Sequence, residues 1–301
     1  MAYPFFLAFR KQSQVMQASI TLDAGPLLRA LYVLLITCTA LLAMPSRAGA
    51  QIYVSQVEAG IVSEYDTKTG QVINANFITA LPGPGALRLS GDVLFVANQF
   101  GAVAKYDAKS GRPINPSFIT GTNFSPTGLA LSGGKLFVAN GEEGTVGKYD
   151  GNTGKAINVS FITGLTPRLI GLGSLGDSLF VADSENGTVG KYNARTGKEI
   201  RTLDVESPYG IAFFGEKLFV ASANAGIAEY NAKTLELINA NFITDLNTPY
   251  QIAVLDGNFP RLFVTNITTE TVGEYDAKTG EVINAAFISA GAEIVGIAVR
   301  P

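Results

Sequence analysis

The residues best placed to do chemistry are polar side chains that recur along the chain at one position of a repeated segment. Each of them ends a short apolar stretch of the type LFVAN. The series is Gln56, Asn98, Asn140, Asp183, Ser222 and Asn266. Carboxylate, amide and hydroxyl oxygens are the ligands that Ca²⁺ and other hard divalent cations prefer. Two interpretations stay open: these side chains satisfy loop backbone groups, or they form a shallow cation site in which Asp183 is the only acid.

The stretches that position these residues define an internal repeat. They begin at Ile52, Leu94, Leu136, Leu179, Leu218 and Leu262, in steps of 42, 42, 43, 39 and 44 residues. The unit that starts at Leu136 contains four strand-like stretches separated by Gly-, Asn- and Asp-rich turns, at 136–139, 145–150, 156–163 and 170–173. We interpret these four strands as one blade. A period near 40 residues with several short strands per unit is typical of a β-propeller.

The fold class predicted for residues 51–301 is therefore all-β, a six-bladed β-propeller of four-stranded blades in a single domain. No sustained 3.6-residue apolar spacing occurs after the N-terminal segment, so no helices are expected there. The first unit starts at Ile52 with the second strand of a blade, while 294–299 matches the innermost strands of earlier units. The C-terminal strand should therefore join the first blade and close the ring, which removes exposed strand edges.

A ligand-binding face is predicted where the polar series meets the loops that enter the innermost strands. Large side chains interrupt the repeat in these loops, near the expected mouth of the channel. The predicted face comprises Asn98, Asn140, Asp183, Asn266, Arg168, Tyr209 and Tyr250. Because the fold does not itself require departures from a repeat, they are sites where function is expected. The partner of this face is predicted to be a protein, a glycan or a small molecule.

Other recurring residues are predicted to be structural. Tyrosine and phenylalanine recur in every unit and should pack between neighbouring sheets. Asp or Asn starts each turn of the type DAKTG, where one acid beside a lysine favours side-chain capping of the turn over a calcium loop. The Asn of the repeated Ile-Asn pair is likewise predicted to be structural.

Composition excludes several kinds of chemistry. The chain has no histidine, and its one cysteine is Cys38. A Ser-His-Asp triad and a Cys-His pair are therefore impossible, and a catalytic zinc site is not expected. No P-loop or dinucleotide-binding glycine motif is present. An acidic surface without a basic cluster argues against nucleic acid as a partner.

Residues 1–50 are predicted to be a signal peptide that is cleaved after Ala50. Arg10, Lys11 and Arg29 precede the apolar run 30–44, and an Ala-x-Ala site follows. Translation starts at Met1 or at Met16. The run is shorter than the roughly 20 residues that a spanning helix needs, so no membrane span is expected after cleavage.

Cleavage would also change the composition of the chain. Removal of four basic residues and one acid leaves 18 basic and 24 acidic residues, a net charge of −6, and no cysteine. We expect an exported, monomeric protein that is periplasmic or extracellular and of bacterial origin.

The repeated strings carry a family resemblance that covers essentially all of 51–301. PTGLAL (126–131) with KLFVAN (135–140), and PYGIA (208–212) with LFVA (218–221), resemble NHL and YVTN-type propeller repeats. The NHL resemblance implies ligand or protein binding and hence a binding or scaffold module. The chain is distantly similar to the gluconolactonase and senescence-marker superfamily, which implies an alternative, a metal-dependent lactonase-like hydrolase with its cation in the channel. The streptogramin lyase branch has a similar repeat, but its catalytic histidine has no counterpart here.

Overall fold

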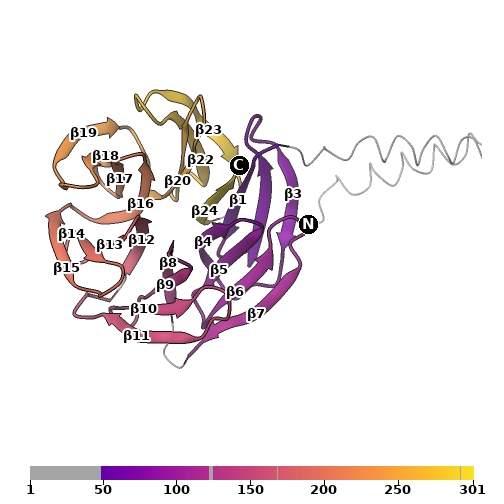
Figure 1. Cartoon of the computed structure of the whole chain (residues 1–301). Coiled ribbons are helices and arrows are strands. Elements are labelled where there is room, and N and C mark those ends of the chain that lie inside the picture. Colours follow the sequence, from indigo (N-terminus) through magenta and orange to yellow (C-terminus); the bar gives the residue numbers. More distant parts are fainter. Residues whose placement is uncertain (1–48, 122–124, 168, 292) are drawn as a thin grey trace, which may run out of the picture. The chain divides into compact units, whose positions relative to one another are not determined.

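The computed structural model describes residues 49–301 except 122–124, 168 and 292. The predicted signal peptide therefore falls almost entirely outside the described residues. Within them the chain forms six sheets, each of four antiparallel strands, arranged as a ring around a central channel (Figure 1). The fold is thus an all-β, six-bladed β-propeller, as predicted. None of the described segments forms a helix that could cross a lipid bilayer.

Each blade runs from an innermost strand at the channel to an outermost strand at the rim. The innermost strands are β24 (Ile294–Arg300), β4 (Pro84–Ser90), β8 (Pro126–Ser132), β12 (Leu169–Leu175), β16 (Pro208–Phe214) and β20 (Pro249–Leu255). The second strands, in the same order of blades, are β1 (Gln51–Gln56), β5 (Val93–Asn98), β9 (Lys135–Asn140), β13 (Ser178–Asp183), β17 (Lys217–Ser222) and β21 (Arg261–Asn266).

The two outer positions of each blade complete the sheets. The third strands are β2 (Ile61–Asp66), β6 (Ala102–Asp107), β10 (Thr145–Asp150), β14 (Thr188–Asn193), β18 (Gly226–Asn231) and β22 (Thr271–Asp276). The outermost strands are β3 (Val72–Ile78), β7 (Pro113–Thr120), β11 (Ala156–Ile162), β15 (Glu199–Asp204), β19 (Leu237–Ile243) and β23 (Val282–Ser289).

The sequence repeat and the blade are offset by one strand. The unit that starts at Leu136 contains β9, β10, β11 and β12, but β12 pairs with β13 of the next blade. The prediction that this unit is one blade is therefore wrong. The reason is connectivity, because the chain leaves each outermost strand and crosses to the channel edge of the following sheet.

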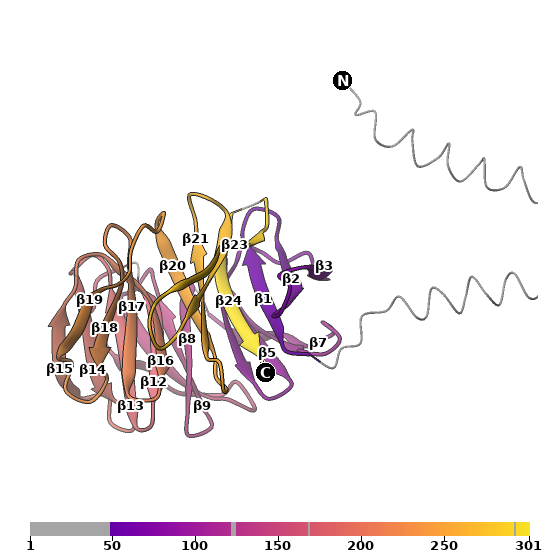
Figure 2. The same ribbon diagram turned by 90° about the horizontal axis from the view of Figure 1, so that it is seen from above.

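The same offset closes the ring as predicted. β24 pairs antiparallel with β1, with Ile297 opposite Val54 and Val299 opposite Ile52 (Figure 2). The first and last parts of the propeller therefore share one sheet, and β1 has a hydrogen-bonded neighbour on both sides. Ile294 and Ile297 of β24 also belong to a buried cluster with Phe263 and Val272 of the preceding blade. The last strand thus seals both a sheet and an interface between sheets.

Six buried clusters fill the spaces between neighbouring blades, as predicted for the repeated aromatic residues. In the first of them, Tyr53 and Phe77 of one blade lie with Leu94 and Tyr106 of the next. Tyr53 and Phe77 are themselves in ring contact within their own blade, with centroids 5.2 Å apart. This aromatic pair therefore joins two strands of one sheet and contacts the next sheet as well.

One blade lacks the outer phenylalanine and takes its aromatic contact from a neighbour. β15 carries Thr202 at that position, because Leu203 lies opposite Val189 just as Ile162 lies opposite Val146 in the preceding blade. Phe180 contacts Phe213 of the following blade instead, with centroids 4.9 Å apart. Gly173 leaves room for this arrangement, because a Cβ atom there would lie 2.7 Å from the Phe213 ring. The blade of β12 to β15 therefore packs against the following blade through these two rings, next to the channel.

Candidate functional site

The channel has two ends that differ in the chain segments around them. At the end that we call the loop end, the innermost strands begin and the second strands finish, so that Pro84 pairs with Asn98, Pro126 with Asn140 and Leu169 with Asp183. At the other end, which we call the hairpin end, a hairpin loop joins the innermost strand to the second strand in five blades, whereas in the remaining blade the end of β24 meets the start of β1. The recurring polar series therefore lies at the loop end, beside the loops that enter the innermost strands.

All six members of the polar series are buried. Their exposed fractions run from 2% to 6%, for Gln56, Asn98, Asn140, Asp183, Ser222 and Asn266. Buried polar groups are strongly destabilising unless they find hydrogen-bond partners. The partners of each side chain therefore show whether the series is structural or open to a ligand.

Asp183 is engaged by the loops of its own blade. One carboxylate oxygen accepts from the backbone N–H of Thr166 at 3.1 Å and from Nδ2 of Asn186 at 3.1 Å. The other accepts from the backbone N–H of Asn186 at 3.2 Å and from the Thr166 hydroxyl. Four donors thus surround the carboxylate, and a cation bound there would have to displace some of them.

Asn140 has the same function in the preceding blade, because its Oδ1 accepts from the backbone N–H groups of Ser125 at 3.1 Å and Glu142 at 3.4 Å. Gln56 donates from Nε2 to the Ser63 hydroxyl at 3.1 Å. The Oδ1 atoms of Asn98 and Asn266 are buried without a hydrogen-bond partner in the part of the chain that the structure describes. The series therefore supports loop backbone in some blades and leaves single amide oxygens unmatched in two others.

The donor set does not fit a cation site of the lactonase type. Among the described residues, no group of three or more His, Cys, Asp or Glu side chains lies close enough together to hold a metal ion. Asp183 contributes one carboxylate, and its oxygens already accept hydrogen bonds from protein donors. A hard cation in a protein takes six or more oxygen ligands when it is Ca²⁺.

The two tyrosines of the predicted face do come together. Tyr209 and Tyr250 lie on neighbouring innermost strands at the loop end, each half-buried, with ring centroids 5.1 Å apart and an interplanar angle of 42°. Burial raises the pKa of the Tyr250 hydroxyl, and the neighbouring Tyr209 and Glu293 raise it further. Arg168, the third large residue predicted there, lies outside the described residues.

The turn and outer-strand residues are structural, as predicted. In the first blade, Oδ1 of Asp66 accepts from the backbone N–H groups of Lys68 and Thr69, both at 2.9 Å. The equivalent residues of the other blades accept from their turns in the same way: Asp107, Asp150, Asn193, Asn231 and Asp276. Asn74 likewise accepts from the backbone N–H of Asn76 at 3.1 Å.

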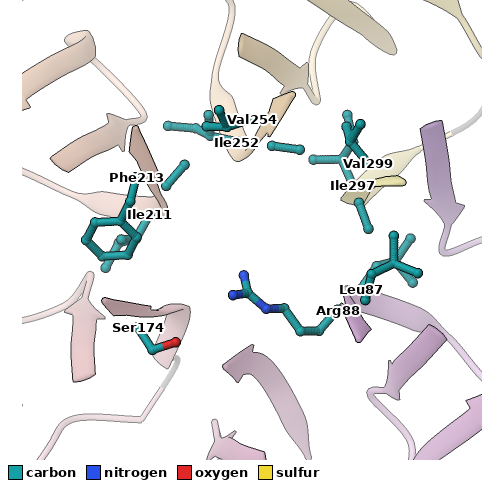
Figure 3. A pocket seen from close by; sticks show the side chains of 13 residues that line it. Leu87, Arg88, Ser174, Ile211, Phe213, Ile252, Val254, Ile297 and Val299 are labelled. Atoms are coloured by element: carbon teal, nitrogen blue, oxygen red, sulfur yellow. The ribbon is translucent and has the colours of Figure 1, made fainter. Parts of the chain in front are cut away.

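The sequence analysis missed one residue that stands out in the structure. Arg88 extends from β4 into a cavity of about 390 Å³ in the channel (Figure 3). It occupies the register position opposite the repeated aromatic residue of the second strand, where it pairs with Phe95. The five other blades carry small residues at this position: Ala130, Gly173, Ala212, Ala253 and Ala298. An alignment of the units on that aromatic residue would have revealed the arginine.

The comparisons with known proteins agree on the fold. Residues 58–157, about a third of the chain, match the family model described as outer membrane protein assembly factor BamB. No curated protein shows significant similarity to the chain.

Solved structures with the same architecture have very different sequences. A chain in the crystal structure of a nidogen/laminin complex is 15% identical, has a TM-score of 0.66, and the match covers 84% of this chain and 99% of that one. A protein of unknown function from Bacteroides caccae is 13% identical, with a TM-score of 0.65 and the same coverage. A chain of the mitotic checkpoint complex is 15% identical, with a TM-score of 0.58, over 82% of this chain and 77% of that one. At these identities the likeness shows the β-propeller fold alone.

Proposed function

We propose that this protein is an exported β-propeller that binds a protein partner at its loop end, with Tyr209 and Tyr250 at the centre of the contact. The observation that carries the proposal is the tyrosine pair itself. At the same strand position the other blades carry Gly85, Thr127, Ile170 and Val295. The ring needs no large aromatic residue there, and both tyrosines keep part of their surface accessible.

The chemistry of this patch suits a protein surface. Tyrosine offers a large, rigid contact area with one polar group, and it is enriched where proteins bind one another. The neighbouring Glu293 supplies a negative charge at the same rim. The side chains of the polar series are buried, so the tyrosines are the groups that a partner can reach.

The comparisons add support of a general kind. The matched family model describes an assembly factor, and two of the similar structures are complexes of several proteins. Export rests on the predicted signal peptide at 1–50 and places the partner in the periplasm or outside the cell. No observation on the described residues favours the hydrolase alternative.

Site-directed photo-crosslinking in intact cells tests the proposal. A benzoylphenylalanine side chain placed at Tyr209 or Tyr250 should give a discrete protein adduct upon irradiation, which mass spectrometry identifies. Ser90, exposed at the hairpin end of β4, is the matched control and should give no such adduct. Equal adducts at all three positions, or none at either tyrosine, would contradict a protein contact at the loop end. An adduct to a glycan would show that the partner is a glycan and not a protein.

A further inference from the structure

The channel cavity has an apolar wall and one charged group. It is lined by the middle residues of the innermost strands, among them Leu87, Ile211, Ile252 and Ile297. Arg88 and Ser174 are the two polar side chains among the described residues of the lining. In Figure 3 the guanidinium of Arg88 extends into the opening while the aliphatic side chains surround it.

Arg88 has no counter-charge in the described part of the chain. No salt bridge, hydrogen bond or aromatic contact joins its guanidinium to another described residue, whereas the other inner-strand arginine, Arg300, pairs with Asp92 at 2.7 Å. Burial lowers the pKa of Arg88, yet an arginine stays charged at neutral pH. A charge that is largely withdrawn from water without a partner is destabilising.

The room around the guanidinium comes from the other blades. At the register of Arg88 they carry alanine or glycine, so their side chains leave the centre of the channel open. Towards the loop end, neighbouring innermost strands come close together: a Cβ atom on Gly171 would lie 1.9 Å from the Tyr209 carbonyl oxygen, and one on Gly296 would lie 2.1 Å from that of Gly85. The cavity therefore lies on the hairpin side of these close contacts and surrounds Arg88.

The hydroxyl of Ser174 is not available to donate a hydrogen bond to an anion in the cavity. Its hydroxyl already donates to the Leu131 carbonyl oxygen at 2.7 Å, across two neighbouring blades. The N–H groups of Arg88 are thus the free donors that the described lining offers.

We propose that this cavity binds a small monocarboxylate, with its carboxylate paired to Arg88 and its apolar body against the aliphatic wall. The planar guanidinium presents two parallel N–H groups that match a carboxylate. A single arginine neutralises one charge, so a doubly charged phosphate would keep an unpaired charge in an apolar cavity. A volume of about 390 Å³ lies in the range of small-molecule sites.

Isothermal titration calorimetry on the purified full chain tests the assignment, with hexanoate as the probe. Hexanoate should bind saturably with one site. Hexanol and inorganic phosphate should each bind at least about tenfold more weakly than hexanoate. Hexanol has the same tail but no carboxylate to pair with Arg88, and phosphate has no apolar tail to contact the wall.

The matched variants separate Arg88 from general charge effects. Arg88→Met should lower the hexanoate affinity at least about tenfold, whereas Arg195→Met, which removes an equally charged but exposed arginine, should leave it unchanged. Circular dichroism checks the fold of each variant, and Arg88→Ala provides a second test because it installs the residue that four blades carry. Absence of hexanoate binding to the unmodified protein, tighter binding of phosphate or hexanol, or full affinity in a folded Arg88 variant would overturn the proposal.

Discussion

The loop end and the channel cavity place polar groups in opposite situations. At the loop end, Asp183 and Asn140 are buried, and donors of the surrounding loops meet their oxygens. In the channel cavity, Arg88 projects among aliphatic side chains, and no described residue pairs with it. The first arrangement stabilises the fold at the expense of ligand access. The second leaves the N–H groups of Arg88 available to a ligand. Substitution should therefore lower the free energy of unfolding at Asp183 and raise it at Arg88.

The largest effect is expected for β24, which contributes to both the cavity and the loop end. β24 contributes Val299 to the cavity, and Glu293 precedes it at the loop end, beside Tyr250. Deletion of 293–301 should leave β1 as an exposed edge and open the ring, which abolishes cooperative thermal unfolding. Calorimetry measures the loss, with deletion of Pro301 alone as the control. A truncated chain that melts at the temperature of the intact one would refute closure by β24.

A smaller effect is expected from the polar series at the loop end. Asp183→Ala removes the acceptor for four donors and should lower the free energy of unfolding by about 2–4 kcal/mol. Ser222→Ala, at the same position in the next blade, should lower it by less than about 0.5 kcal/mol, because no side-chain hydrogen bond of Ser222 is seen among the described residues. Urea denaturation compares the two variants.

The same pair of variants distinguishes a structural carboxylate from a cation ligand. If Asp183 is structural, its loss should cost the same stability in EDTA as in millimolar Ca²⁺. A loss of stability that occurs only with Ca²⁺ would instead indicate a cation site that includes Asp183.

The smallest effect is expected at the turn carboxylates. Asp150 accepts from Nζ of Lys135 at 2.9 Å and from the turn that contains Thr153, and these hydrogen bonds hold the pKa of its carboxyl well below the usual range. Stability linked to this group is fully present above its unfolded pKa of about 3.9 and is lost as the pH falls through the lower folded pKa.

Asp150→Asn, which copies Asn193 of the next blade, should preserve the turn and flatten the acid side of the stability curve slightly. Chemical denaturation between pH 2 and pH 6 measures this change. An unchanged slope would show that the carboxylate has no stabilising role.

Most of the fold could be predicted from the sequence because the repeat makes each element visible six times. Strand periods, turn chemistry and the match between 294–299 and the other innermost strands all led to a closed ring. The unit that starts at Leu136 was wrongly interpreted as one blade, although the start of the first unit was correctly predicted to be the second strand of a blade. A repeat can be read from any starting strand, and connectivity decides which strands share a sheet.

The candidate site was predictable only in part. The recurring position of Asp183 and Asn140 located the loop end, but their hydrogen-bond partners come from loops whose paths no local pattern encodes. Tyr209 and Tyr250 were singled out as departures from the repeat, whereas their contact depends on the angle between two blades. Arg88 was detectable by register, yet the apolar cavity around it is created together with four other innermost strands, β12, β16, β20 and β24.

The most direct test of the contrast between the loop end and the channel cavity is the free energy of unfolding of Arg88→Ala, measured by urea denaturation without added ligand. Our account predicts a gain of about 1 kcal/mol, because the substitution removes a largely buried, unpaired charge and restores the residue that four blades carry. A loss of 1 kcal/mol or more, in the direction expected for Asp183→Ala, would show that Arg88 supports the fold like the polar residues at the loop end, and would contradict its assignment to a ligand.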